Sequence, residues 1–363
     1  RKGRLLSLLL VVCLAAGMMP ATVFAVPGTS GNPRTAASRA ARERRSVLLV
    51  DPTAPGGGIL GYRAGEYDHV YFGARGSSAD TPPAPLAWRV LDVETSGGKT
   101  VLFLLADEQL GGNIQFNKSE TDSNTWSGSN AQAWCKDFAG ETSSGLAASP
   151  FTDKERAAFL AVSDDVLSAD KVFFLSEADV KNAAYGFGSP SLRIFKNISW
   201  WLRTPLPTDN NKVLVVERDG LTNHVLVNSP YGVRPAFKLD MSQVLFVESG
   251  GSSSAGTNAT VPLEADKGAG WRIVLRDTSR TFKAYLDGGS GSGPVELDQD
   301  KGGNIDITYQ DAMRGDDEYV SFLLADADGN VLYHGQICDV KTDDKKNGTG
   351  TVAVPKDLPE GSY

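Results

Sequence analysis

Residues 249–259 are the stretch that most constrains how this chain can fold. They read Ser-Gly-Gly-Ser-Ser-Ser-Ala-Gly-Thr-Asn-Ala and contain no large apolar side chain. Such a composition cannot bury enough apolar surface to offset the entropy that is lost when a segment becomes ordered. We therefore place a Gly/Ser-rich linker at residues 248–263, between two separately folded domains at residues 46–247 and 264–363.

The N-terminal segment has the pattern of a secretory signal. Three basic residues precede an uncharged run over residues 5–19, and small residues follow as far as Ala25. This run is shorter than the roughly 20 apolar residues that a membrane span requires. We expect a signal peptide over residues 1–25, cleavage after Ala25, and an extracellular or cell-envelope-associated bacterial product with no stable membrane span.

Charge and cysteine content narrow the possible functions. The formal net charge is −8, and residues 1–25 carry three positive charges and no negative ones, so an exported chain is more acidic still. Nucleic-acid binding is disfavoured, because clustered Lys and Arg supply most of its affinity. Cys135 and Cys338 are the cysteines that remain after processing. They are far apart in the sequence, which excludes a disulfide framework.

Residues 26–45 contain five arginines and few large apolar side chains. This composition predicts a solvated basic linker, and the alternative is a basic arm that contacts an anionic cell-wall polymer. The short apolar run at residues 46–50 has strand character, so we expect ordered structure to begin there.

Short strand-like runs alternate with a few capped helices up to residue 247, which predicts an α+β domain. Three capping patterns predict helices: Ser129 ahead of residues 131–138, Thr152 and Glu155 ahead of residues 157–161, and Ser176 with Asp179. Asp219 and Gly220 stand between strand-like residues 213–217 and 221–227. These two residue types readily adopt the turn conformations of a tight hairpin.

The remainder of the chain is rich in β-strand patterns. Strand-like runs occur at residues 271–275, 305–309, 319–324, 331–337 and 351–354. Gly, Asp and Asn turns separate them and no helical pattern intervenes, which predicts an immunoglobulin-like β-sandwich. The sequence stops at Tyr363 within a strand-like run, so we expect an incomplete sandwich that continues in the natural protein.

Motifs for cofactors, metal ions and catalysis fail in their context. Gly56, Gly58 and Gly61 match a dinucleotide fingerprint, but no amphipathic helix follows them. The three histidines are isolated from one another, without the spacing typical of metal ligands. We therefore predict no cofactor, no metal ion and no identifiable catalytic residues.

Six segments occur in an order that resembles the family catalogued as domain of unknown function 6273. They are Tyr-Phe-Gly at 71–73, Trp-Arg-Val-Leu at 88–91, Asn-Thr-Trp at 124–126, Val-Phe-Phe-Leu-Ser at 172–176, Trp-Trp-Leu-Arg-Thr-Pro at 200–205 and Gly-Val-Arg-Pro-Ala-Phe at 232–237. The resemblance runs from about residue 65 to residue 247. It implies a secreted protein of Gram-positive gut bacteria, with appended β-rich modules.

A more distant similarity connects these segments to C-type-lectin-like folds and to the formylglycine-generating enzyme group. The sequence departs from both active patterns. That enzyme group needs a cysteine pair, and this region has Cys135 alone. The Glu-Pro-Asn, Gln-Pro-Asp and Trp-Asn-Asp segments of calcium-dependent sugar binding are missing. The resemblance therefore implies a C-type-lectin-like fold without an implied activity.

The predicted domain contains five of the six tryptophans of the chain. Trp200 and Trp201 are adjacent on a predicted strand and must point to opposite faces, so one core can take one of them. The other needs a second layer, a partner or a ligand. A structural role in the domain interior is the favoured interpretation of these two tryptophans and of Arg203 and Arg234. The alternative is a carbohydrate- or peptide-binding surface formed by Trp200, Trp201, Arg203, Asp209, Asn210 and Arg234.

The leading hypothesis is a secreted or cell-surface binding or adhesion module, whose ligand is a glycan, a peptide, or a host or envelope protein. An enzyme is the less favoured class. Its most plausible form is an envelope-polymer hydrolase, which predicts two acidic residues facing each other in a cleft beside Trp200 or Trp201. A third hypothesis is a structural spacer that binds nothing, which predicts no exposed aromatic cluster.

Overall fold

The structure is a computed structural model. It describes residues 9–15, 22–23, 67–75, 84–96, 99–119, 121, 123–249, 260–262, 271–275, 283–286, 303–310, 319–325, 331–338 and 347–354. Several sequence predictions lie outside the described residues: the basic linker 26–45, the strand-like run 46–50, the glycines at 56, 58 and 61, and linker residues 250–259.

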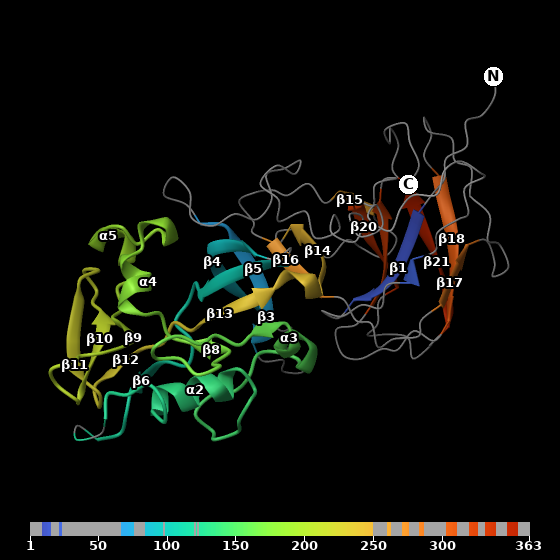
Figure 1. The fold of residues 1–363 in the computed structure, drawn as a ribbon. Coiled ribbons are helices and arrows are strands. Elements are labelled where there is room, and N and C mark those ends of the chain that lie inside the picture. Colours follow the sequence, from blue (N-terminus) through green and yellow to red (C-terminus); the bar gives the residue numbers. More distant parts are fainter. Residues whose placement is uncertain are drawn as a thin grey trace. The chain divides into compact units, whose positions relative to one another are not determined.

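The chain divides into two compact units, one over residues 59–242 and the other over residues 1–58 with 243–363. Strands make up 45% and helices 16% of the structure, which confirms a β-rich chain with short helices. The pairing within its sheets is almost entirely antiparallel (Figure 1).

The first sheet of unit 59–242 consists of long, buried strands. Its order is β3 (His69–Arg75), β4 (Ala84–Ser96), β5 (Lys99–Ala106), β13 (Ala236–Asp240) and β7 (Phe159–Leu160), all antiparallel. The short strand β8 (Val172–Phe173) also pairs with β13. The residues from Leu102 to Ala106 on β5 are all buried, as expected of a central strand covered on both faces.

The second sheet of this unit carries the tryptophan strand. Its order is β11 (Thr222–Leu226), β10 (Lys212–Val216), β9 (Trp200–Pro205), β12 (Pro230–Gly232) and β6 (Asn113–Gln115). These strands pair antiparallel except at β12 and β9, which are parallel where Gly232 meets Trp200. The predicted hairpin is confirmed: Gly220 joins β10 to β11 in the left-handed region, with φ 80°.

The three predicted helix starts are confirmed. Ser129 caps α2 (Asn130–Phe138) by accepting a hydrogen bond from the Gln132 N–H. Reciprocal capping boxes begin α3 (Asp153–Ala157) and α4 (Glu177–Lys181). Two short elements, η2 (Ala183–Tyr185) and α5 (Pro190–Arg193), then lead toward β9.

The prediction of a helix as far as residue 161 is wrong, because α3 ends at Ala157 and the chain continues as β7. Leu160 and Phe159 pair with Lys238 and Leu239 on β13. The Phe159 ring lies 4.6 Å from that of Phe237 and is buried. Burial of this ring against the sheet outweighs the weak local preference for one more helical turn.

An aromatic cluster fills the core between the first sheet and its helices. Trp88 lies 4.6 Å from Phe237 in an edge-on arrangement, and its Nε1–H donates to the Phe72 carbonyl at 2.8 Å. Phe151 packs edge-on against Phe159 at 4.8 Å. Such ring pairs add to the stabilisation from burial alone and give a rigid base for the loops outside the sheet.

The described residues of the second unit lie in strands, apart from Gln243 at the end of the 3-10 turn η3 (Met241–Gln243) and the bend at Asn347. β14 (Val244–Ser249) pairs with β16 (Trp271–Leu275), and β18 (Gly303–Gln310) lies between β17 (Lys283–Leu286) and β21 (Gly348–Val354). Another sheet has the order β15 (Thr260–Pro262), β20 (Val331–Cys338), β19 (Tyr319–Ala325), β1 (Leu9–Ala15) and β2 (Thr22–Val23). The five strands predicted after residue 263 are all present.

Strand β1 falls within the segment that the sequence predicts to be a signal peptide. It pairs antiparallel with β19, with Leu9 opposite Ala325 and Ala15 opposite Tyr319. Removal of residues 1–25 would leave that edge of β19 without its neighbour. Among the described residues, no helix is both long and apolar enough to cross a membrane.

Candidate functional site

The two adjacent tryptophans of β9 are both fully buried. On one face, Trp201 packs against Phe116 and Tyr231, and its Nε1–H donates to the Ile114 carbonyl at 2.8 Å. Trp200 lies beside Arg234, at 4.8 Å. Each ring has its own layer of neighbours, so neither presents a free face on which a sugar could stack.

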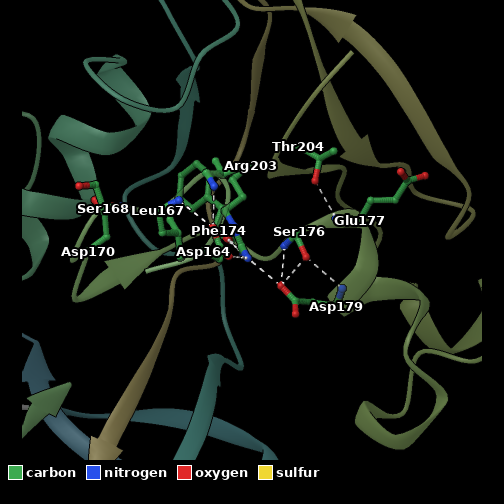
Figure 2. A network of polar contacts seen from close by, with 11 residues as sticks. Asp164, Leu167, Ser168, Asp170, Phe174, Ser176, Glu177, Asp179, Arg203 and Thr204 are labelled. Atoms are coloured by element: carbon green, nitrogen blue, oxygen red, sulfur yellow. Dashed lines mark hydrogen bonds and ion pairs between the residues drawn. The ribbon is translucent and has the colours of Figure 1, made fainter. Parts of the chain in front are cut away.

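Arg203 follows on the same strand and joins three segments of the chain (Figure 2). Its Nη2 donates to Asp164 Oδ2 at 2.7 Å, and its Nη1 donates to Asp179 Oδ2 at 3.0 Å. Nη1 also donates to the Phe174 carbonyl at 2.7 Å. One guanidinium therefore connects β9 to the 162–170 loop and to the start of α4.

The network around Arg203 is buried at its centre and open at one edge. The side chain of Arg203 is 7% exposed, whereas that of Asp164 is 38% exposed. The Nε of Arg203 has no hydrogen-bond partner in the structure. Asp179 Oδ2 also accepts from the N–H and the hydroxyl of Ser176. The two carboxylates thus share one cation, the arrangement expected of a structural ion-pair cluster.

Electrostatics hold Asp164 in its ionised form. Burial raises the pKa of this carboxyl, but the N–H groups of Leu167 and Val166 and the charge of Arg203 together lower it below its ordinary value. A glycosidase acid needs a raised pKa, so that it carries a proton to donate. Asp164 and Asp179 are the two carboxylates that share Arg203, and the lowered pKa of Asp164 does not suit an acid that must donate a proton.

The 162–170 loop is ordered by hydrogen bonds from end to end. Val162 and Asp170 form a bridge, and the Asp170 carboxylate accepts from Gln132 Nε2 at 2.8 Å and from the Ser168 N–H at 2.9 Å. Ala169 adopts φ 58°, a conformation that costs a non-glycine residue free energy. Asp164 is therefore presented by a rigid loop.

Arg234 is the most deeply buried charged residue of the site, with 0% exposure. Its Nε and Nη2 both donate to the Ala106 carbonyl, at 3.1 and 3.0 Å. Its guanidinium carbon lies 3.6 Å from the centroid of Phe195, and Trp200 is on the same group at 4.8 Å. Burial and the charge of Arg89 lower the pKa of Arg234, and Asp107 partly offsets them.

We name the group around this ring the Phe195 cluster: Phe195, Arg89, Lys196, Arg234, Asp107, His69 and Tyr67. The Arg89 guanidinium lies 5.4 Å from the Phe195 centroid and 4.9 Å from that of Tyr67. Lys196 Nζ lies 5.2 Å from Phe195 and donates to the Asp107 carbonyl at 2.7 Å. Three cations therefore surround a single aromatic ring.

Asp107 is the carboxylate of the Phe195 cluster. Its Oδ1 accepts from Arg89 Nε, and its Oδ2 lies 3.4 Å from His69 Nε2. Burial raises the pKa of Asp107, but contact with His69 and the charge of Arg89 outweigh burial and hold the pKa well below its ordinary value. The carboxylate is therefore ionised and offsets one of the three positive charges.

A tight turn fixes the position of the ring. Lys196 and Asn197 have φ 44° and 58°, and the Ile198 N–H donates to the Phe195 carbonyl at 2.9 Å. Two consecutive left-handed residues define the type I′ geometry that suits a two-residue hairpin. This turn places Phe195 over Arg234 and leaves Lys196 exposed at the tip.

The remaining two predicted site residues lie in a separate loop. Asp209 pairs with Lys212 at 2.8 Å, and hydrogen bonding from Lys212 lowers the pKa of Asp209. Asn210 is exposed, and its carbonyl accepts from the Asn124 N–H at 2.7 Å. Among the described residues, the contacts of Asp209 and Asn210 are with Lys212, Asn211 and Asn124 and their loop neighbours, and not with Arg203 or Arg234. Within the described residues, no group of three or more His, Cys, Asp or Glu side chains could hold a metal ion.

Sequence reasoning did not identify these members of the two networks as site residues: Asp164, Asp179, Phe195, Arg89, Asp107, Lys196, His69 and Tyr67. The Ser176 pattern identified Asp179 as a helix cap but not as a partner of Arg203. Asp164 was indistinguishable from a solvated loop carboxylate. A Lys-Asn pair between apolar residues is a hairpin signal that could have located the turn under Phe195.

The comparisons with known proteins found a match within unit 59–242. Neither the curated proteins nor the solved structures contain a match. Residues 99–241 match the family described as a domain of unknown function (DUF6273), which confirms that part of the expected resemblance, and this segment contains Arg203, Phe195 and Arg234.

Proposed function

We propose that this protein is a secreted, cell-envelope-associated binding module of a bacterium, with a C-type-lectin-like domain followed by an immunoglobulin-like domain. Its ligand site is the Phe195 cluster. The observation that carries the proposal is the charge of that cluster: Arg89, Lys196 and Arg234 surround one ring, and the Asp107 carboxylate pairs with Arg89.

An excess of positive charge is unusual at a site that has only a structural role. Buried charges in proteins are normally paired, because an unpaired one loses its hydration without compensation. Arg234 is fully buried, and within the described part of the chain its hydrogen bonds go to a backbone carbonyl and to no carboxylate. An anion bound at the exposed part of the cluster would be attracted by this buried charge without contacting it.

Two loops elsewhere in unit 59–242 are held by hydrogen bonds and show that the surface of this unit is well ordered. Arg203 fixes the 162–170 loop, and the buried Asp137 accepts hydrogen bonds from Thr142, Ser144 and Leu146. A preorganised surface loses little conformational entropy when it binds a ligand, which favours affinity. The lowered pKa of Asp164 does not suit the proton-donating acid of a hydrolase, so a binding role is favoured over hydrolysis.

Export is the part of the proposal that rests on the N-terminal pattern. Residues 1–25 combine basic residues, an uncharged run and a small-residue cleavage pattern. N-terminal sequencing of protein recovered from the medium of a Gram-positive expression host tests it. A mature chain that begins at Val26 supports export, and an uncut chain retained in the cells contradicts it.

Binding is tested with the full chain on a glycan array and against a panel of purified extracellular host proteins. We expect at least one ligand class to bind, and we expect the double variant Arg89→Gln/Lys196→Gln to lose that binding. Arg218→Gln is the matched control, because Arg218 is exposed on the β10–β11 turn, outside the cluster. Silence on both panels, or equal binding by all variants, would overturn the proposal.

A further inference from the structure

We infer that the Phe195 cluster binds the carboxylate of an acidic sugar. This inference rests on the proposed binding function and specifies its ligand. The cluster brings Arg89, Lys196 and Arg234 to one ring while Asp107 supplies one negative charge. A single carboxylate on the ligand would offset part of the remaining positive charge.

Donor groups are available for that carboxylate at the surface. Arg89 donates through Nε to Asp107, and its two terminal amino groups donate to no described residue. A guanidinium edge of this kind matches the geometry of a carboxylate. The Arg89 side chain is 19% exposed, and the proposed site places the ligand carboxylate against its terminal amino groups.

Lys196 and Arg234 have different parts in the proposed site. Lys196 is exposed at the tip of its turn, and its ammonium group uses one of its three donors on the Asp107 carbonyl. Arg234 is fully buried and cannot contact a ligand. Its charge acts on the ligand through the protein interior, whose low dielectric constant makes the attraction to an anion stronger than in water.

The charge of the whole chain argues for a ligand with isolated carboxylates over a polyanion. The formal net charge is −8, so a densely charged polymer would be repelled by most of the surface. At the Phe195 cluster, three cations supply the attraction. A sugar acid within an otherwise neutral glycan satisfies this local attraction without bringing further negative charge to the protein.

The topology favours a sugar over an acidic peptide. Peptides are commonly recognised by addition to an open strand edge. Arg89 lies on β4, which is paired with β3 on one side and with β5 on the other. β4 therefore offers no free edge to a peptide backbone, whereas Asn197 offers an exposed amide to sugar hydroxyls.

The probes are uronate- and sialate-terminated oligosaccharides, and each is paired with the neutral methyl ester of its carboxyl group. Both forms are titrated into the full chain and followed by calorimetry. We expect the acids to bind at least tenfold more tightly than their esters, and to weaken as ionic strength rises. Lys196→Gln should weaken binding of the acids about tenfold without changing the esters. Arg218→Gln should bind as the native chain does.

The possible outcomes distinguish a wrong ligand class from a wrong proposal of a binding function. Binding of acids and esters with equal affinity, or of glutamate-rich peptides in place of the sugars, overturns the inference but leaves a binding module. Absence of binding by every acidic sugar overturns the inference, and silence on both panels above overturns the proposed function as well. Lys196 is exposed, so thermal unfolding of Lys196→Gln should match the native chain and exclude misfolding as the cause.

Discussion

Arg203 Nη2 donates to Asp164 Oδ2 at 2.7 Å, although β8, α4, η2 and α5 lie between the two residues in the sequence. This contact fixes a loop without regular structure to the strand that contains both tryptophans. Asp179 completes the arrangement from the start of α4, at 3.0 Å. The three segments can therefore move relative to one another only if a buried guanidinium loses its partners.

Replacement of Arg203 by Met should destabilise unit 59–242. Asp179 would lose its cation while remaining largely buried, and Asp164 would return to partial hydration because it is already exposed. We expect the free energy of unfolding to fall by about 3 kcal/mol. Urea unfolding followed by tryptophan fluorescence measures this, since five tryptophans lie in the unit.

The matched control for that measurement is Arg218→Met. Arg218 is exposed on the β10–β11 turn, so its loss should change the free energy of unfolding by less than about 0.5 kcal/mol. Arg203→Lys separates charge from geometry, because lysine keeps the charge and loses the planar fork. Equal stability of Arg203→Met and the native chain would show that the network contributes nothing.

Asp137 makes stability depend on acid pH. Burial raises the pKa of this carboxyl, but hydrogen bonds from Thr142, Ser144 and Leu146 outweigh burial and hold the pKa well below its ordinary value of 3.8. The stabilisation is therefore fully present above that value and is lost as pH falls below it. We expect the free energy of unfolding to decrease between about pH 5 and pH 2.

The Asp137→Asn variant tests the assignment. An amide has one acceptor oxygen and no charge, so the variant should be less stable at pH 7 and should show a shallower dependence on pH below 4. Asp219→Asn is the control, since Asp219 is exposed in a turn. An unchanged slope in Asp137→Asn would assign the acid sensitivity to other carboxylates.

The parts of the fold that local chemistry determines could be predicted from the sequence. A hydroxyl three residues before an acidic residue identified the starts of α3 and α4, and Asp219-Gly220 identified a hairpin, because these signals act over fewer than five residues. The helix expected through residue 161 does not form, because a contact distant in the sequence outweighs the local signal. Phe159 packs against Phe237, a residue far along the chain.

The candidate site could be predicted in its residue types but not in its partners. Trp200, Trp201, Arg203 and Arg234 were identified because adjacent tryptophans and isolated arginines need explanation. Their neighbours were not, since a loop carboxylate such as Asp164 has no periodic pattern. Asp209 and Asn210 were grouped with Arg203 by sequence proximity, whereas β10 and its preceding loop place them in a different environment.

Gly220 should tolerate no side chain. It has φ 80°, and a Cβ built there would lie 1.8 Å from the Pro190 carbonyl oxygen. Gly220→Ala must therefore displace α5 from the β10–β11 turn, and we expect a loss of about 3 kcal/mol. Gly112→Ala is the matched control: φ is 74° and no atom lies within 4 Å, so backbone strain of about 1 kcal/mol should be the whole cost. Urea midpoints of the two variants should differ accordingly.

Asn124 should control the order of the loop that contains Asp209 and Asn210. Its Nδ2 lies 3.1, 2.9 and 2.9 Å from the carbonyls of Leu206, Asp209 and Lys212. Asn124→Asp keeps the size of the side chain but replaces the donor by a carboxylate oxygen that repels those carbonyls, so we expect a loss of about 2 kcal/mol. Trypsin cleavage after Lys212, followed by mass spectrometry, should become at least tenfold faster.

Asn210→Asp makes the same chemical change at an exposed position of the same loop, and it should leave both the stability and the cleavage rate unchanged. Equal cleavage rates in the two variants would mean that the loop is held by other contacts.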